Sequence, residues 1–369
     1  MRIAIVTFHN AFNYGATLQC VALSYMLSKE GMEVSVIDYL PKYVEDKKSV
    51  FRYLKSIKNS NNKIKGLAKG VAYLRFAGDI QKRNSAFDDF VRQNVKLTET
   101  YVTWKDLEMN PPAADAYICG SDQVWNKVIT NNCFDRAFFL QFVKSGLRIA
   151  YAVSLGETSP SGNKDELLTL TRGFDFISVR EENVAKELRK VLSRDVATGI
   201  DPTLFLEEAD YSIFEKPVDF AQIRYLLLYN IQNSALSISL AEKIAREKNL
   251  SIIDISPNPF QKVKGSIKKI YVGPGEFLTL VKNAEFIVTN SFHGMAFSLI
   301  YKKQFYTVPH KKRPERMISL LRLSGLESRI INSSNDELSY SLIDYDNVSE
   351  KIRKVSEVSK TLLLNAIER

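Results

Sequence analysis

The chain contains the stretch AEFIVTNSFHGMAFSLIYKKQF at residues 284–305, which is typical of a strand, a very short loop and a helix. A compact apolar run predicts the strand, and apolar residues at helical spacing predict the helix. In an open α/β sheet such a loop lies at the carboxyl edge of the strands, where ligands bind. The free N–H groups and the dipole of the first helical turn favour an anion there. We therefore consider Ser291, His293 and Gly294 as candidate binding residues.

The same three residues also have a purely structural interpretation. Ser291 can serve only as the N-cap of the helix, Gly294 can serve only to allow close packing, and His293 can be one polar residue at a helix end. Strand-loop-helix junctions are common, and a single histidine does not decide between the two interpretations. Both stay open from these residues alone.

The bulk composition indicates a soluble globular protein large enough for two α/β domains, with 369 residues of which 45% are hydrophobic. The N-terminal sequence MRIAIVTF has an apolar run too short for a signal peptide, and no window approaches the length of an uncharged membrane span. We expect a cytoplasmic protein. The cysteines at positions 20, 119 and 133 fit no metal-ligand spacing, so we expect reduced, mostly buried thiols and no metal site.

The net charge of +9 is concentrated between residues 41 and 105, where 15 Lys and Arg stand against 6 Asp and Glu. Apolar residues in this stretch fall near helical spacing with lysines between them, which predicts basic amphipathic helices. Such helices can lie on anionic membranes or bind polyanions. The alternative is the solvated outer face of ordinary helices packed on a sheet.

The order of the remaining elements predicts an α/β chain of two Rossmann-like domains facing each other across a cleft. The first domain, residues 1–210, carries the basic helical insertion at about 41–105. The second covers residues 221–345, and a last helix at 346–369 crosses back. The predicted strands are residues 2–8, 33–38, 116–119, 148–155, 176–179, 196–206, 225–229, 250–255, 286–288 and 304–308.

Polar residues follow three predicted strands of the first domain. Asn13 and Gly15 follow the first strand, where a small residue lets backbone approach a ligand or permits a tight turn. Arg180 follows the strand at 176–179 and can fork onto a carboxylate or phosphate, or pair with a neighbouring acid. The loop GSDQVWN at 120–126 offers amides, a carboxylate and an aromatic ring, a composition that suits sugars. Its candidate residues are Ser121, Asp122, Gln123, Trp125 and Asn126, with Trp125 as a core residue and Asp122 as a cap in the alternative interpretation.

Five motifs, taken together, resemble the polysaccharide pyruvyl transferase family. They are Asn13-Tyr14-Gly15 with Leu18-Gln19, GSDQVWN at 120–126, SVRE at 178–181, DPT at 201–203 and TNSFHG at 289–294. The resemblance spans residues 1 to about 326. It implies a two-domain, GT-B-like fold and transfer of pyruvate from phosphoenolpyruvate to a sugar of a cell-surface polysaccharide, such as a capsule or exopolysaccharide, or of its lipid-linked precursor. The product would be a pyruvate ketal, and no cofactor is implied.

The resemblance also implies roles for individual residues. His293 matches the functional histidine of the family, the implied general acid for the enol CH2 of the donor. Arg180 matches the arginine of the SVR(D/E) motif, the implied phosphoenolpyruvate anchor. Asp122 and its loop would hold the acceptor on the first domain, and the second domain would hold the donor.

The sequence departs from the family pattern at two places. Many members carry Arg at the position of Ser291, so this chain lacks one expected anion clamp. Some members carry Gly-Asp where Gly15-Ala16 stands. Arg313 and Arg316, in a segment that also contains Lys311 and Lys312, can supply the missing charge. A solvated basic loop is the simpler interpretation of that segment.

The implied partners are phosphoenolpyruvate and a glycan or polyprenyl-diphosphate-linked sugar, and no nucleic acid. The basic stretch at 41–105 in addition predicts peripheral association with the inner face of the membrane. Two other functions stay open. One is a GT-B-like glycosyltransferase that places the diphosphate of UDP or GDP on the same helix N-terminus. The other is a non-catalytic module that holds a glycan or a phosphorylated ligand.

Overall fold

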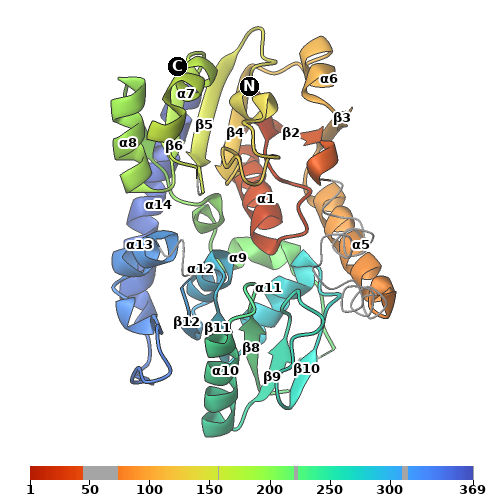
Figure 1. Ribbon diagram of the computed structural model, residues 1–369, viewed down its shortest axis with the longest axis vertical. Helices are drawn as coiled ribbons and strands as arrows, with labels where there is room; N and C mark the ends of the chain where they lie inside the picture. Colours follow the sequence, from red (N-terminus) through yellow and green to blue (C-terminus); the bar gives the residue numbers. More distant parts are fainter. Residues whose placement is uncertain (45–73, 157, 220–222, 310–314, 369) are drawn as a thin grey trace. The chain divides into compact units, whose positions relative to one another are not determined.

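The computed structural model describes residues 1–44, 74–156, 158–219, 223–309 and 315–368. These residues form two compact units, each with its own sheet (Figure 1). The first unit combines the described residues of Met1–Glu45, Val91–Leu206 and Ile352–Arg369. The second combines those of Asp46–Phe90 and Glu207–Lys351. Residues 45–73 of the basic stretch lie outside the described part of the chain.

The first unit is built on a parallel sheet of seven strands in the order β3-β2-β1-β4-β5-β6-β7. The central strands are buried almost without interruption, as is usual for a parallel sheet covered on both faces. The first five strands follow the Rossmann order, which brings the ends of β1, β4, β5 and β6 to one edge. The strands are β1 Arg2–Val6, β2 Glu33–Tyr39, β3 Leu97–Tyr101, β4 Ala116–Asp122, β5 Leu147–Val153, β6 Phe176–Val179 and β7 Ala197–Thr198.

The helices of the first unit connect these strands. The longest connecting helix that lies wholly in this unit, α1, contacts β2, β4 and the 3-10 turn η3 and buries nearly all its residues. Asn13 caps its start, and Gly31, with φ +80°, follows its end. The helical elements are α1 Tyr14–Lys29, α6 Trp104–Met109, η1 Arg136–Phe139, η2 Ser161–Asn163, α7 Lys164–Thr171, α8 Glu182–Leu192 and η3 Pro202–Phe205.

The second unit has a parallel sheet of five strands in the order β10-β9-β8-β11-β12. Its strands are β8 Tyr225–Tyr229, β9 Ser251–Asp254, β10 Ser266–Lys268, β11 Phe286–Thr289 and β12 Gln304–Thr307. Its helical elements are α9 Glu208–Tyr211, η4 Ser212–Phe214, α10 Ala235–Lys248, α11 Pro274–Asn283, α12 Phe292–Ile300, α13 Glu315–Ser324 and η5 Glu327–Arg329. Two helices belong to both units by sequence, α5 Ala77–Asn94 and α14 Tyr345–Ile367.

The predicted α/β class with two Rossmann-like units is confirmed, whereas the cleft between them stays a prediction. Three local predictions were wrong. Residues 120–122, expected in a loop, complete β4 and pair with β5 up to Asp122 and Val153. The strand expected at 196–206 is cut short because Pro202 begins a 3-10 turn capped by Asp201. Strand β3 lies inside the stretch at about 41–105 that was expected to be a basic helical insertion.

No helix formed by the described residues is long and apolar enough to cross a membrane. The described residues also contain no group of three or more His, Cys, Asp or Glu arranged to hold a metal ion. Cys20 and Cys119 are buried free thiols, and Cys133 is an exposed one. Burial raises the pKa of Cys20 to about 12 and raises that of Cys119 well above its usual value. These two thiols therefore stay protonated and behave as small core residues.

Candidate functional site

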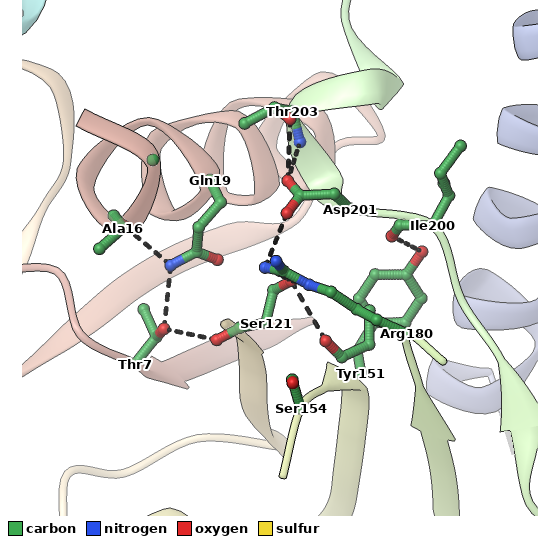
Figure 2. Close-up of polar contacts among 12 residues, drawn as sticks. Thr7, Ala16, Gln19, Ser121, Tyr151, Ser154, Arg180, Ile200, Asp201 and Thr203 are labelled. Carbon is green, nitrogen blue, oxygen red and sulfur yellow. Dashed lines mark hydrogen bonds and ion pairs between the residues drawn. The ribbon is translucent and has the colours of Figure 1, made fainter. Parts of the chain in front are cut away.

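Arg180 lies directly after β6 and is held in a buried ion pair (Figure 2). Its NH2 nitrogen is 2.7 Å from Oδ2 of Asp201, and the two side chains are 4% and 0% exposed. Its Nε and NH2 nitrogens donate to Oγ of Ser121 at 3.1 and 2.6 Å. The structural interpretation of this residue, pairing with a neighbouring acid, therefore applies. Its implied role as donor anchor stays a prediction.

The network around Arg180 joins four of the five motifs identified in the sequence. Oγ1 of Thr7 donates to the backbone oxygen of Ser121 at 3.1 Å, and Nε2 of Gln19 donates to Oγ1 of Thr7 at 3.0 Å (Figure 2). Asp201 accepts two further bonds from Thr203. Sequence reasoning missed the role of Asp201. The available signal was a carboxylate inside the DPT motif, within the stretch 196–206 that was expected to be a strand.

Asp122 ends β4 in an unusual backbone conformation. Its φ is +72°, in the left-handed region that non-glycine residues rarely adopt. Ala152, on the adjacent strand β5, has φ +46° within a shift of register against β6. Such strain and such irregularities cluster at functional sites. The Asp122 carboxylate is half-buried and has no hydrogen-bond or ion-pair partner within the described ranges, so it can accept a bond from a ligand hydroxyl.

Most other residues at 120–126 are interior and only Gln123 is half-buried, so the ring of Trp125 offers no aromatic platform for a sugar. Trp125 is fully buried, its ring stacks on Phe139 with centroids 4.6 Å apart, and its Nε1 donates to the backbone oxygen of Phe138. Asn126 is also fully buried, and its Nδ2 donates to Oε1 of Gln123 at 2.8 Å. Trp125 is thus a core residue, as its alternative interpretation held. Ser121, likewise buried, serves Arg180 rather than a ligand surface.

Asn13 and Gly15 open α1. Oδ1 of Asn13 accepts hydrogen bonds from the backbone nitrogens of Gly15 and Ala16 at 2.9 and 3.4 Å. This is the geometry of an N-cap, so capping explains the presence of Asn at this position. Asn13 itself is exposed, which leaves its predicted contact with an acceptor untested.

The second group of candidates meets at the start of α12. Ser291 is the N-cap residue, but its side chain makes no capping bond, and His293 lies in the first turn with 7% exposure. The His293 ring stands at right angles to that of Phe292, with centroids 5.1 Å apart. The guanidinium of Arg316, from α13, lies over the same Phe292 ring at 5.7 Å. Of the predicted donor-binding residues, Ser291 and Gly294 flank this turn and Arg316 lies over its Phe292 ring. Arg313 lies outside the described residues.

Gly294 is required by close packing. A Cβ atom on Gly294 would meet Oγ1 of Thr289 at 2.3 Å and the Tyr229 ring at 3.1 Å. We expect Gly294→Ala to lower the free energy of unfolding by about 1–3 kcal/mol, measured by denaturant titration, because the helix must shift away from the sheet. Gly78→Ala is the matched control, since nothing lies within 4 Å of its new Cβ. An equal loss in both variants would show that packing is not the cause.

The two parallel sheets define an α/β protein, a class whose ligands usually bind at the carboxyl edges of the strands, where the polar candidates lie. A family model described as polysaccharide pyruvyl transferase matches residues 13–312 of the chain. The protein therefore belongs to the polysaccharide pyruvyl transferase family and is a transferase. A search of curated proteins gave no match.

Solved structures with a similar chain path include the N-terminal domain of a Candida albicans trehalose-6-phosphate phosphatase. It has 10% identity and a TM-score of 0.53, and the match covers 100% of this chain and 96% of that one. The UDP-N-acetylglucosamine 2-epimerase of Rickettsia bellii has 10% identity, a TM-score of 0.49 and coverage of 98% and 94%. The UDP-GlcNAc 2-epimerase of Neisseria meningitidis bound to UDP-GlcNAc has 12% identity, a TM-score of 0.46 and coverage of 99% and 94%. At such identities the likeness concerns the fold alone.

Proposed function

We propose that the protein transfers pyruvate from phosphoenolpyruvate to a sugar, forming a cyclic ketal across two hydroxyls. The observation that carries the proposal is the grouping of His293, Ser291 and Arg316 at the N-terminus of α12. The helix N-terminus and the guanidinium suit the phosphate or carboxylate of the donor, and the imidazole beside them can deliver a proton. Family membership supports pyruvyl transfer as the reaction.

The proposed reaction needs two groups, an acid that protonates the donor and a carboxylate that binds the acceptor hydroxyl. His293 gives a proton to the enol CH2, so the neighbouring carbon becomes oxocarbenium-like. One sugar hydroxyl adds to that carbon and loses its proton, and phosphate leaves with the electron pair of its bond to the same carbon. The second hydroxyl then adds and also loses its proton, which closes the ring. Asp122, whose carboxylate has no hydrogen-bond or ion-pair partner among the described residues, is our candidate for holding the acceptor hydroxyl and taking a proton from it.

A thermal-shift screen tests the donor. Phosphoenolpyruvate at 100 times its dissociation constant should stabilise the protein by about 2.7 kcal/mol. UDP, GDP and free sugars are each tested alone, because a response to one of them would indicate a different function. Stabilisation by UDP or GDP without a response to phosphoenolpyruvate would indicate a nucleotide-sugar glycosyltransferase instead. A response to phosphoenolpyruvate without pyruvate transfer to any glycan would indicate a binding module.

The basic stretch at 41–105 supports a lipid-linked acceptor. Its balance of +9 suits an anionic membrane surface or a diphosphate, with each charge near the surface contributing about 1 kcal/mol. We expect the protein to sediment with vesicles containing anionic lipid at low salt, and less so as salt is raised. Equal sedimentation with neutral vesicles would point to a glycan acceptor that is not lipid-linked.

A further inference from the structure

A line of hydrogen-bonded side-chain amides, those of Gln261, Asn230 and Asn290, crosses the carboxyl edge of the second sheet and ends at the loop before His293. Asn230 and Asn290 directly follow β8 and β11, which pair in register through Tyr229 and Thr289, so the two side chains meet. Nδ2 of Asn290 donates to Oδ1 of Asn230 at 2.6 Å. Asn290 is 1% exposed and Asn230 is 0% exposed. The pair is therefore shielded from water, and a hydrogen bond in such an interior is stronger than one exposed to solvent.

The line continues across two more strands. Nδ2 of Asn230 donates to Oε1 of Gln261 at 2.9 Å, and Nε2 of Gln261 donates to Oδ2 of Asp254, the last residue of β9, at 3.1 Å. Lys268, which ends β10, donates to the same Oδ2 at 2.9 Å. The Asp254 side chain is fully buried, and that of Lys268 is 21% exposed. The buried carboxylate is thus paired, as a charge in this position must be.

The carboxylate gives the line a direction. Ionised Asp254 can only accept, so Gln261 must turn its NH2 group toward it and its oxygen toward Asn230. Asn230 must then donate to Gln261 and accept from Asn290. Ser234 holds Asn230 in the same orientation, because its N–H donates to Oδ1 and its C=O accepts from Nδ2. The amide orientations are therefore fixed by chemistry as far as Asn290.

Asn290 in turn fixes the start of α12. With its NH2 group committed to Asn230, its Oδ1 accepts the backbone N–H of Ile231 at 2.8 Å, and its backbone oxygen accepts from Gln232. Ser291, the next residue, donates its N–H to Oγ1 of Thr289 at 3.0 Å. The two residues before the helix are thus tied to the strand ends, and His293 follows in the first turn.

We propose that Asn290 is a positioning residue of the pyruvyl transfer, acting on His293 through the backbone of residues 290–293 and oriented by the amide line that ends at Asp254. The inference rests on the proposed role of His293 as the acid. It adds that the line, rather than packing alone, holds this acid where the donor CH2 binds. A misplacement of about 1 Å at a reacting group can cost on the order of 100-fold in rate.

The test is a kinetic cycle of Asn290→Asp and His293→Gln, with turnover measured at saturating phosphoenolpyruvate. Asn290→Asp keeps the shape and the bond from Ile231 but cannot donate to Asn230. We expect it to lower kcat by roughly 10-fold in the native background. In the His293→Gln background it should lower kcat by less than about 2-fold, because the group it positions is already lost.

Asn258→Asp is the matched control. Asn258 also donates from Nδ2 to an asparagine, Asn233, at 2.7 Å and also accepts a backbone N–H through Oδ1, but it is not part of the line. It should leave kcat unchanged. If Asn290→Asp does not fold, Asp254→Asn tests the same line from its far end, with the same cycle and a smaller expected loss.

The outcomes separate this inference from the proposed function. Losses that multiply in the double variant, or an Asn290→Asp enzyme as fast as the native one, would overturn the positioning role. A His293→Gln enzyme that retains full turnover would instead overturn the role of His293. An equal loss in Asn258→Asp would show that the added charge, not the broken line, slows the reaction.

Discussion

Replacing His293 with glutamine should lower pyruvyl transfer by about 100-fold or more while the protein still binds phosphoenolpyruvate. Glutamine can donate a hydrogen bond to the donor but cannot deliver a proton to the enol CH2. His293 lies in the first turn of α12 against the ring of Phe292, which also contacts the guanidinium of Arg316, and the donor anion is proposed to bind here. Turnover and donor affinity, measured separately, distinguish loss of the acid from loss of the site.

His293→Ala should be at least as slow and should also fold, because the backbone of this loop is tied to the strand ends through Thr289 and Asn290. The rate at which solvent deuterium enters the product methyl group reports directly on the proton transfer. Deuterium entry at the native rate in the glutamine variant, together with substantial product, would mean that another residue delivers the proton and that His293 only orients the donor.

The strands and the candidate loops could be located from sequence because their signals are local. The apolar runs at 225–229 and 176–179 coincide with β8 and β6, and the loop before His293 lies at a strand end as the sequence indicated. A short strand such as β10, with its three half-buried residues, carries no comparable apolar signal and was missed. Local pattern thus sufficed where a strand is wholly buried.

The partners of the site residues could not be read in the same way, because they are set by which strands become neighbours. The sequence left Arg180 as either an anion anchor or the partner of a neighbouring acid, and only the strand order and η3 bring it against Ser121 and Asp201. Trp125 has the same composition signal whether its ring faces a sugar or Phe139. Asn290 had no signal of its own, since its importance comes from Asn230, 60 residues away in the sequence.

Replacing Asp201 with asparagine should lower the free energy of unfolding by about 3–5 kcal/mol, because it leaves the Arg180 charge buried without its counterion. The two side chains are 4% and 0% exposed, so water cannot take the place of the carboxylate. Chemical denaturation followed by circular dichroism measures the change. Asp115→Asn is the matched control, since its partner Arg2 and Asp115 itself are about half exposed and the change should be small.

A double variant tests whether the unpaired charge is the cause. Arg180→Met combined with Asp201→Asn removes both charges, so it should be more stable than Asp201→Asn alone. If instead the two losses add, the pair contributes through packing and not through charge.

Arg180→Lys tests the role of Arg180 in donor binding. Lysine retains the charge but lacks the planar fork of the guanidinium, so it cannot reproduce the paired contacts with Ser121 and Asp201. A folded Arg180→Lys enzyme with native affinity for phosphoenolpyruvate would show that Arg180 has a structural role only, in its contacts with Ser121 and Asp201. A selective loss of donor affinity at native stability would make it the donor anchor that the family resemblance implies.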